Sequence, residues 1–179
     1  YFPSLNFMQT RRSFVSQVAA TVAVSSISAP FVRAASNRAL VVGSGEHTYE
    51  CVHDWLLPPE GMVWGDTHGL AQDSQGNIYV GHTVHASSMR PEAIVVYDAK
   101  GKFIRAFGAD FRGGAHGLDV RKEGSSEILY HCDTARSRVV KTSLKGEVLW
   151  SHGYPKETPS YAEKPINFIP TNVAFAPNG

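Results

Sequence analysis

The sequence predicts an all-β protein of the β-propeller class, and an internal repeat is the main evidence. The tripeptide His-Gly-Leu occurs at residues 68–70 and again at 116–118. Short apolar runs follow each copy, and a Lys-Gly turn lies at nearly the same distance from each, at Lys100-Gly101 and Lys145-Gly146. A third copy opens at 170–174 with Pro-Thr-Asn-Val-Ala. Repeats of about 40–50 residues made of four short strands are typical of propellers, which close with about 4–8 such blades.

The first copy, at about residues 66–108, is expected to form four strands joined by tight turns. Between the first two apolar runs the chain has the cluster Asp-Ser-Gln-Gly-Asn at 73–77. Gly and Asn accept the positive φ that hairpin turns require, so this cluster predicts a turn. The four expected strands lie at 70–71, 78–80, 94–98 and 103–107.

The second copy, at about 115–153, repeats the pattern, with expected strands at 118–120, 128–130, 139–140 and 148–150. The third copy, at 170–179, stops at its first turn, so we expect an N-terminal fragment of a longer propeller. Two further strands are expected before the copies, at 39–42 and 49–55, as outer strands of the blade that closes the ring. The segment 154–169 is polar and carries several prolines, which predicts a long loop on one face.

The N-terminal region predicts an export signal. The first Met is Met8, so residues 1–7 are expected to be upstream or artefactual, and 8–35 to be the signal. Arg11-Arg12 followed by a mildly apolar run resembles a twin-arginine signal, with an ordinary secretory signal as the alternative. The run is too short and too rich in Ser and Thr for a membrane anchor. We therefore expect a bacterial protein that the twin-arginine machinery exports to the periplasm or beyond, with its partial propeller at 36–179.

The composition limits the classes of partner. The formal net charge is +1, 42% of the residues are hydrophobic and 18% are charged, which is typical of a globular domain. No basic stripe with interleaved aromatic residues occurs, so nucleic acid is not an expected partner. Stable insertion into a membrane is not expected either. A small molecule or a peptide is the expected ligand class.

Two histidines are candidates for a metal site. His116 opens the innermost strand of its copy, and in a propeller such positions from several blades converge on the central channel. Three neutral imidazoles with one open position form a catalytic zinc site. The alternative is a channel-lining histidine that hydrogen-bonds water and backbone. His68 holds the same place one copy earlier and is a second candidate ligand.

A polar loop in the first copy holds three further candidates, His82, His85 and Arg90. The two histidines have His-x-x-His spacing. Residues three apart on a strand face opposite sides, so they would share a metal only if the loop folded them together. The sequence contains no complete active site of a recognised kind.

Several segments resemble NHL-repeat propellers, and among these the peptidyl-hydroxyglycine amidating lyases. Residues 69–73, Gly-Leu-Ala-Gln-Asp, resemble the lyases' Gly-Val-Ala-Leu-Asp, and residues 115–118, Ala-His-Gly-Leu, resemble their Pro-His-Gly-Leu. Residues 170–174 resemble their Pro-Thr-Asp-Val-Ala. The resemblance covers about residues 67–179. It implies a six-bladed propeller with a zinc held by three histidines and a calcium, which cleaves an α-hydroxyglycine-extended peptide to a peptide amide and glyoxylate.

By this resemblance His116 is a zinc ligand, and the backbone carbonyls of Leu70 and Leu118 face the calcium. The lyases have His-Arg after their second strand, with a catalytic Arg, where this chain has His82-Thr83. Thr carries no fixed positive charge for a carboxylate or an oxyanion, so Arg90 is the remaining candidate. The resemblance implies a metal-dependent lyase, and a non-catalytic scaffold that binds a peptide, glycan or partner protein is the main alternative. Lactonase-type hydrolysis is a further option, because propellers of that kind also hold a channel metal.

Overall fold

The computed structural model describes residues 40–159 and 168–176, and within these ranges nearly all regular structure is β. Three antiparallel sheets of two, four and four strands confirm the prediction of an all-β protein. The expected signal at 8–35 lies outside the described residues, as do residues 1–7 and much of the expected loop at 154–169. No helix in the described part is long and apolar enough to cross a membrane.

The chain divides into two compact units, residues 1–50 and 51–179. In the first unit, β1 (Leu40–Ser44) pairs with β2 (His47–Cys51) as a hairpin. The second strand had been expected to reach Trp55 but ends at Cys51. Asp54 adopts a φ of 57°, and this left-handed backbone conformation is incompatible with a continuing strand.

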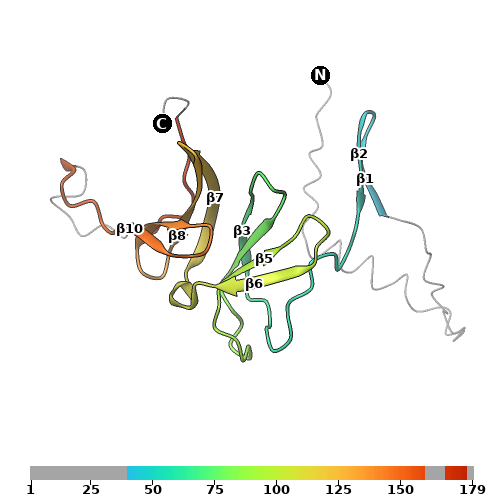
Figure 1. The fold of residues 1–179 in the computed structure, drawn as a ribbon, viewed down its shortest axis with the longest axis horizontal. Helices are drawn as coiled ribbons and strands as arrows, with labels where there is room; N and C mark the ends of the chain where they lie inside the picture. The colour runs from blue at the N-terminus through green and yellow to red at the C-terminus, as the bar shows by residue number, and fades with distance from the viewer. Residues whose placement is uncertain (1–39, 160–167, 177–179) are drawn as a thin grey trace, which may run out of the picture. The chain divides into compact units, whose positions relative to one another are not determined.

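The second unit begins with a four-stranded meander that coincides with the first sequence copy (Figure 1). Its strands pair in chain order and are β3 (Thr67–Gln72), β4 (Ile78–His82), β5 (Ile94–Tyr97) and β6 (Phe103–Phe107). The Asp73 carboxylate accepts hydrogen bonds from the backbone N–H groups of Gln75 and Asn77, which closes the β3–β4 turn. This contact is the physical basis of the turn predicted from the cluster at 73–77.

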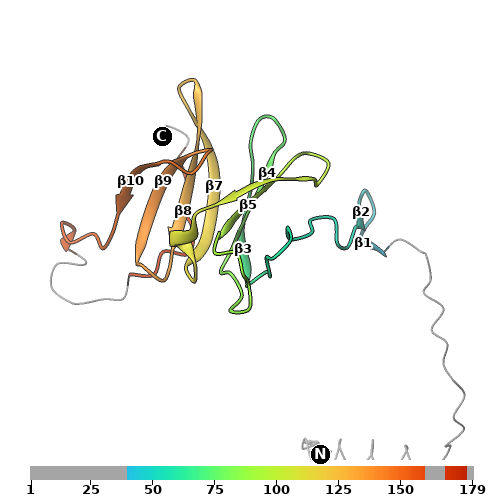
Figure 2. The ribbon, with the colours of Figure 1, turned by 60° about the horizontal axis from the view of Figure 1, so that its bottom comes forward.

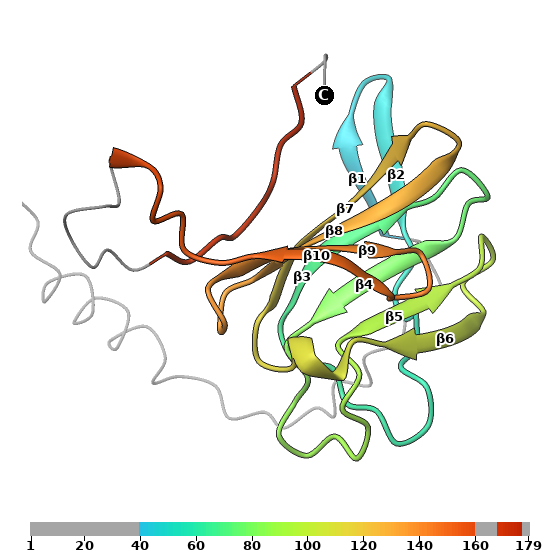
Figure 3. The same ribbon diagram turned by 60° about the vertical axis from the view of Figure 1, so that its left-hand side comes forward.

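A second meander coincides with the second copy and is seen best in Figures 2 and 3. Its strands are β7 (Ala115–Glu123), β8 (Ser126–Asp133), β9 (Arg138–Ser143) and β10 (Val148–His152), and the short 3-10 helix η1 (Ala109–Phe111) joins the two sheets. The turn between β5 and β6 and the turn between β9 and β10 are closed by the same type of side-chain hydrogen bond. Asp98 Oδ1 accepts from the N–H groups two and four residues on, and Ser143 Oγ does the same in the second sheet.

The two meanders share one hydrophobic core. Its buried side chains come from both sheets and from η1, and they include Tyr79, Ile94, Val96, Phe111, Leu118, Leu129 and Val140. Burial of apolar surface of this kind stabilises by roughly 25 cal/mol per Å². The sheets are therefore held together by packing across their faces, with β3 beside β7 (Figures 1 and 2).

β3 lies close to β7, and β7 lies close to the start of the third copy. Glycines make this close approach feasible. A Cβ on Gly69 would lie 2.6 Å from the carbonyl oxygen of His116, and a Cβ on Gly117 would lie 2.6 Å from that of Thr171. The same close approach of a glycine to a backbone carbonyl therefore occurs between β3 and β7 and between β7 and the start of the third copy. His68, His116 and Thr171 hold equivalent places in this series.

Candidate functional site

Two imidazoles from the neighbouring strands β3 and β7 lie face to face. His68 of β3 and His116 of β7 have ring centroids 4.2 Å apart and planes within 8° of parallel. His68 is exposed and His116 is half-buried. Together with Thr171, Asn172 and the backbone of the His-Gly-Leu segments, they line a pocket of about 290 Å³. The pocket is at the small end of the range for ligand sites in proteins.

Both histidines lie at irregularities in their sheets. The pairing of β3 with β4 shifts register between Thr67 and Gly69, which leaves one extra residue on β3. The pairing of β7 with β8 shifts in the same way between Ala115 and Leu118. Such bulges redirect side chains and are frequent beside functional sites. The regular alternation of a strand therefore does not dictate where His68 and His116 point.

The tautomer of His116 follows from one contact. Its Nδ1 lies 2.8 Å from the carbonyl oxygen of Thr171. A carbonyl only accepts, so Nδ1 carries the proton, and in the neutral ring Nε2 carries the lone pair. A metal-binding histidine typically donates its other N–H to a carbonyl or carboxylate in this way, which orients the ring. His116 therefore has the donor arrangement of a zinc ligand.

The described residues do not bring three candidate metal-ligating side chains together. Within 40–159 and 168–176, no three His, Cys, Asp or Glu side chains lie close enough to hold one ion. The expected calcium contacts lie beside the histidines, because Leu70 and Leu118 both line the same pocket. Leu70 is 67% exposed, whereas Leu118 is 6% exposed and packs in the core between the sheets. Calcium binding by their carbonyls stays a prediction.

His82 is fully buried at the end of β4, and both of its ring nitrogens are used within the protein. Nδ1 accepts from the N–H groups of Gly65 and Val84, and Nε2 donates to the carbonyl of Glu92. Burial lowers the pKa of His82 and keeps the ring neutral. Next to it, Thr83 Oγ1 accepts from the N–H of Asp66. His82 and Thr83 thus hydrogen-bond the segment at Gly65 and Asp66, which precedes β3, to the end of β4.

The other two loop candidates also have partners of their own. His85 is exposed, and its Nδ1 lies 2.8 Å from Ser87 Oγ. Arg90 forms an ion pair of 2.8 Å with Glu92, and its hydrogen bonds to that carboxylate lower the pKa of Glu92. None of His82, His85 and Arg90 lines the pocket between His68 and His116.

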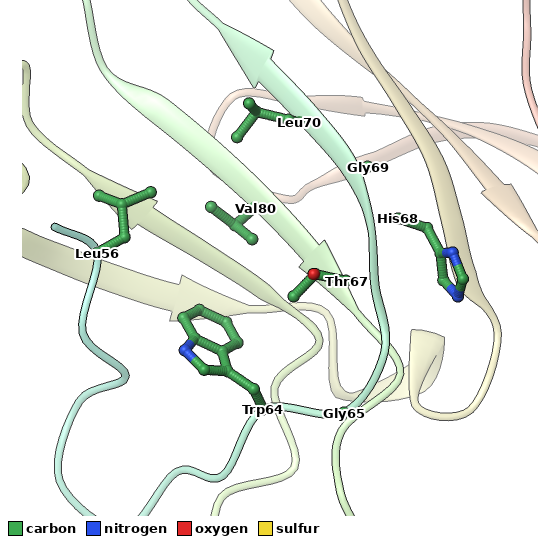
Figure 4. Close-up of a pocket in the computed structure, with 8 residues that line it drawn as sticks. All are labelled: Leu56, Trp64, Gly65, Thr67, His68, Gly69, Leu70 and Val80. Carbon is green, nitrogen blue, oxygen red and sulfur yellow. The ribbon is translucent and has the colours of Figure 1, made fainter. Parts of the chain in front are cut away.

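A second, more apolar groove lies along β3. It has a volume of about 430 Å³, and Leu56, Trp64 and Val80 supply much of its apolar lining. Figure 4 shows these three side chains on one side of β3, while His68 points away on the other. Sequence reasoning missed this groove because Leu56 and Trp64 lie before the first copy. It also missed the Thr171 carbonyl, because a backbone acceptor has no residue signature.

No protein-family model matches the chain, and no curated protein matches it either.

Proposed function

We propose that the chain forms part of an NHL-type β-propeller with a metal-dependent site in its channel, similar to that of the peptide-amidating lyases. The observation that carries the proposal is the His116–Thr171 contact. It orients an imidazole with its free Nε2 at a pocket where the inner segments of three successive copies meet.

The propeller part of the proposal is supported by the relation between the copies. Two meanders of the same strand order pack face to face, and Gly69 and Gly117 each approach the backbone of the next inner segment at the same distance. Further copies that repeated this relation around a common axis would form a ring, and closure of the ring would cover the remaining sheet faces. The resemblance of the motifs to NHL repeats supports about six blades.

The metal part is supported by the donor chemistry. Zinc takes neutral imidazole nitrogen readily, and the lone pair on His116 Nε2 is of that kind. A bound zinc would polarise an oxygen of the substrate. In the lyase reaction the α-hydroxyl loses its proton, the C–N bond breaks, and the amide nitrogen gains a proton, so that a peptide amide and glyoxylate form. In this chain His116 would bind the metal and the Thr171 carbonyl would hold its ring in place.

The substrate carboxylate would need a positive charge, and this chain lacks the Arg that supplies it in the lyases. Thr83 replaces their Arg and is hydrogen-bonded to Asp66, while Arg90 is paired with Glu92. This favours, as the second candidate, a non-catalytic propeller that binds a peptide, a glycan or a partner protein. The groove of Leu56, Trp64 and Val80 offers such a ligand an apolar surface. For either function the segment 8–35 supports export from the cytoplasm.

The test is the metal content of the exported protein, measured by mass spectrometry on wild type, His116→Ala and His85→Ala. About one zinc per chain is expected in wild type and in His85→Ala, whose histidine lies outside the pocket, and none in His116→Ala. Circular dichroism verifies that all three are folded. A folded wild type that contains no metal would rule out the lyase function and favour the non-catalytic scaffold.

A further inference from the structure

We infer that His68 is a positioning residue that holds the imidazole of His116 by stacking on it, and that it is not a second ligand of the same ion. The inference rests on the proposed function, in which His116 binds a metal. It assigns His68 a role that the resemblance does not supply, because the lyases have no ligand at this position.

The ring geometry argues against a shared ion. The lone pair of an imidazole nitrogen lies in the plane of its ring, and zinc binds along it at about 2.0–2.1 Å. The rings of His68 and His116 are within 8° of parallel, with centroids 4.2 Å apart. An ion in the plane of His116 therefore lies well outside the plane of His68. The stacked arrangement allows one of the two rings to bind that ion.

The hydrogen bonds distinguish the two histidines in the same way. His116 donates Nδ1–H to the Thr171 carbonyl, as a ligand histidine typically does. No residue in the described ranges 40–159 and 168–176 hydrogen-bonds the ring of His68. The ring of His68 instead stacks on the ring of His116. His116 thus has the surroundings of a ligand, whereas His68 has those of a supporting ring.

The stacking supplies a restraint that the hydrogen bond lacks. A single Nδ1–H···O contact fixes one direction in the ring plane but lets the ring swivel about that direction. A parallel ring over its face blocks the swivel. His68 lies at the register shift of β3, so its side chain is not bound to the regular alternation of the strand. The hydrogen bond to Thr171 and the stacking on His68 together fix the direction in which the Nε2 lone pair of His116 points.

The experiment uses Co(II) as the probe, because its visible absorption reports the ligands directly. The exported full-length protein is freed of metal, and Co(II) is titrated into wild type, His68→Ala, His68→Phe and His116→Ala. Ring stacking predicts that His68→Ala binds Co(II) roughly two- to tenfold more weakly, with an unchanged absorption spectrum. His68→Phe restores the affinity because a planar ring is retained, and His85→Ala serves as the neutral control.

Three results overturn the inference. One is an unchanged affinity in His68→Ala. Another is a loss of affinity that His68→Phe does not restore, together with an altered spectrum, which would make His68 a ligand. The third is a wild type that binds no Co(II), which removes the proposed function as well. If wild type binds Co(II) and His116→Ala does not, the proposed function stands. The His68 variants alone then decide whether His68 positions the ring of His116.

A measurement without metal separates the stacking from the metal site. In the metal-free protein, the ring C–H resonances of His116 are shifted by the ring current of a stacked neighbour. We expect His68→Ala to move these resonances in an NMR spectrum and His68→Phe to keep a stacked-ring shift. Resonances that do not move in His68→Ala would show that the rings are not stacked in solution and would overturn the inference.

Discussion

The Nδ1–H of His116 donates to the carbonyl oxygen of Thr171 over 2.8 Å, across the boundary between the second and third copies. The neighbouring Gly117 has no room for a side chain, because a Cβ there would lie 2.6 Å from the same oxygen. One backbone carbonyl thus both orients the candidate ligand and sets how closely the two copies approach.

Gly69→Ala is expected to destabilise the packing of the two sheets. The new Cβ would lie 2.6 Å from the carbonyl oxygen of His116 and 2.6 Å from Leu118 Cβ, so the inner strands must separate. Overpacking of this kind costs about 1–3 kcal/mol, measured as the free energy of unfolding in urea. Gly153→Ala is the matched control, because its nearest atom would be 3.8 Å away. Equal stabilities of the two variants would contradict the close approach of β3 and β7.

Acid is expected to destabilise the protein through His131. Its ring is buried on β8, stacks on Phe111, and bonds Thr142 Oγ1 through Nε2, while Nδ1 has no partner among the described residues. Burial lowers the pKa of His131 from 6.5 to about 4, against a small opposing effect of Asp110. Between these two pKa values the unfolded chain binds a proton that the folded protein does not. Stability is therefore complete above pH 6.5 and falls as the pH drops toward 4.

This loss amounts to about 3 kcal/mol by pH 4. The measurement is urea unfolding between pH 7 and 4 for wild type and His131→Gln, which has no titratable ring. The difference between the two profiles isolates His131 from other groups, including His82. The difference should be largest at pH 7 and should decrease toward pH 4. Parallel profiles throughout would argue against a buried neutral ring.

Asp133→Ala is expected to cost about 1–3 kcal/mol, because its carboxylate is completely buried and accepts hydrogen bonds that would lose their acceptor. Oδ2 accepts from Arg138 Nε at 2.9 Å, and Oδ1 accepts from the backbone N–H of Arg136 at 3.1 Å. Removal takes this acceptor from Arg138 Nε, while the ion pair of Arg138 with Asp110 at 3.0 Å remains. Glu92→Ala is the comparison, since its pair with Arg90 is partly exposed and such pairs contribute about 0–1 kcal/mol. Chemical denaturation of both variants should give clearly different losses.

The proposed function predicts that removal of metal lowers the melting temperature of wild type and leaves that of His116→Ala unchanged. A ligand that binds only the folded state stabilises by about 2.7 kcal/mol at a hundredfold excess over its Kd. Differential scanning fluorimetry with EDTA, and then with added zinc, measures the effect in both proteins. His85→Ala should respond as wild type does. An EDTA effect of equal size in His116→Ala would assign the metal to another place.

Most of the local structure could be predicted from the sequence because it depends on local chemistry. The turns at Asp73 and Asp98 form through contacts within four residues, and the apolar runs between them become strands. The end of β2 at Cys51 could not be read in this way. It depends on the backbone of Asp54, a residue type that tolerates either conformation.

The sequence by itself determined the four strands of each meander and the turns at 73–77, 98–101 and 143–146. It also determined that His68 and His116 lie near the start of the first strand of each meander, since all of these follow from short-range pattern. Only the tertiary structure decided what the histidines do there. It stacks His68 on His116, gives His116 the Thr171 carbonyl, and uses both nitrogens of His82 inside the protein. These contacts join residues far apart in the chain, several through backbone atoms. Residue identity carries no information about a backbone partner.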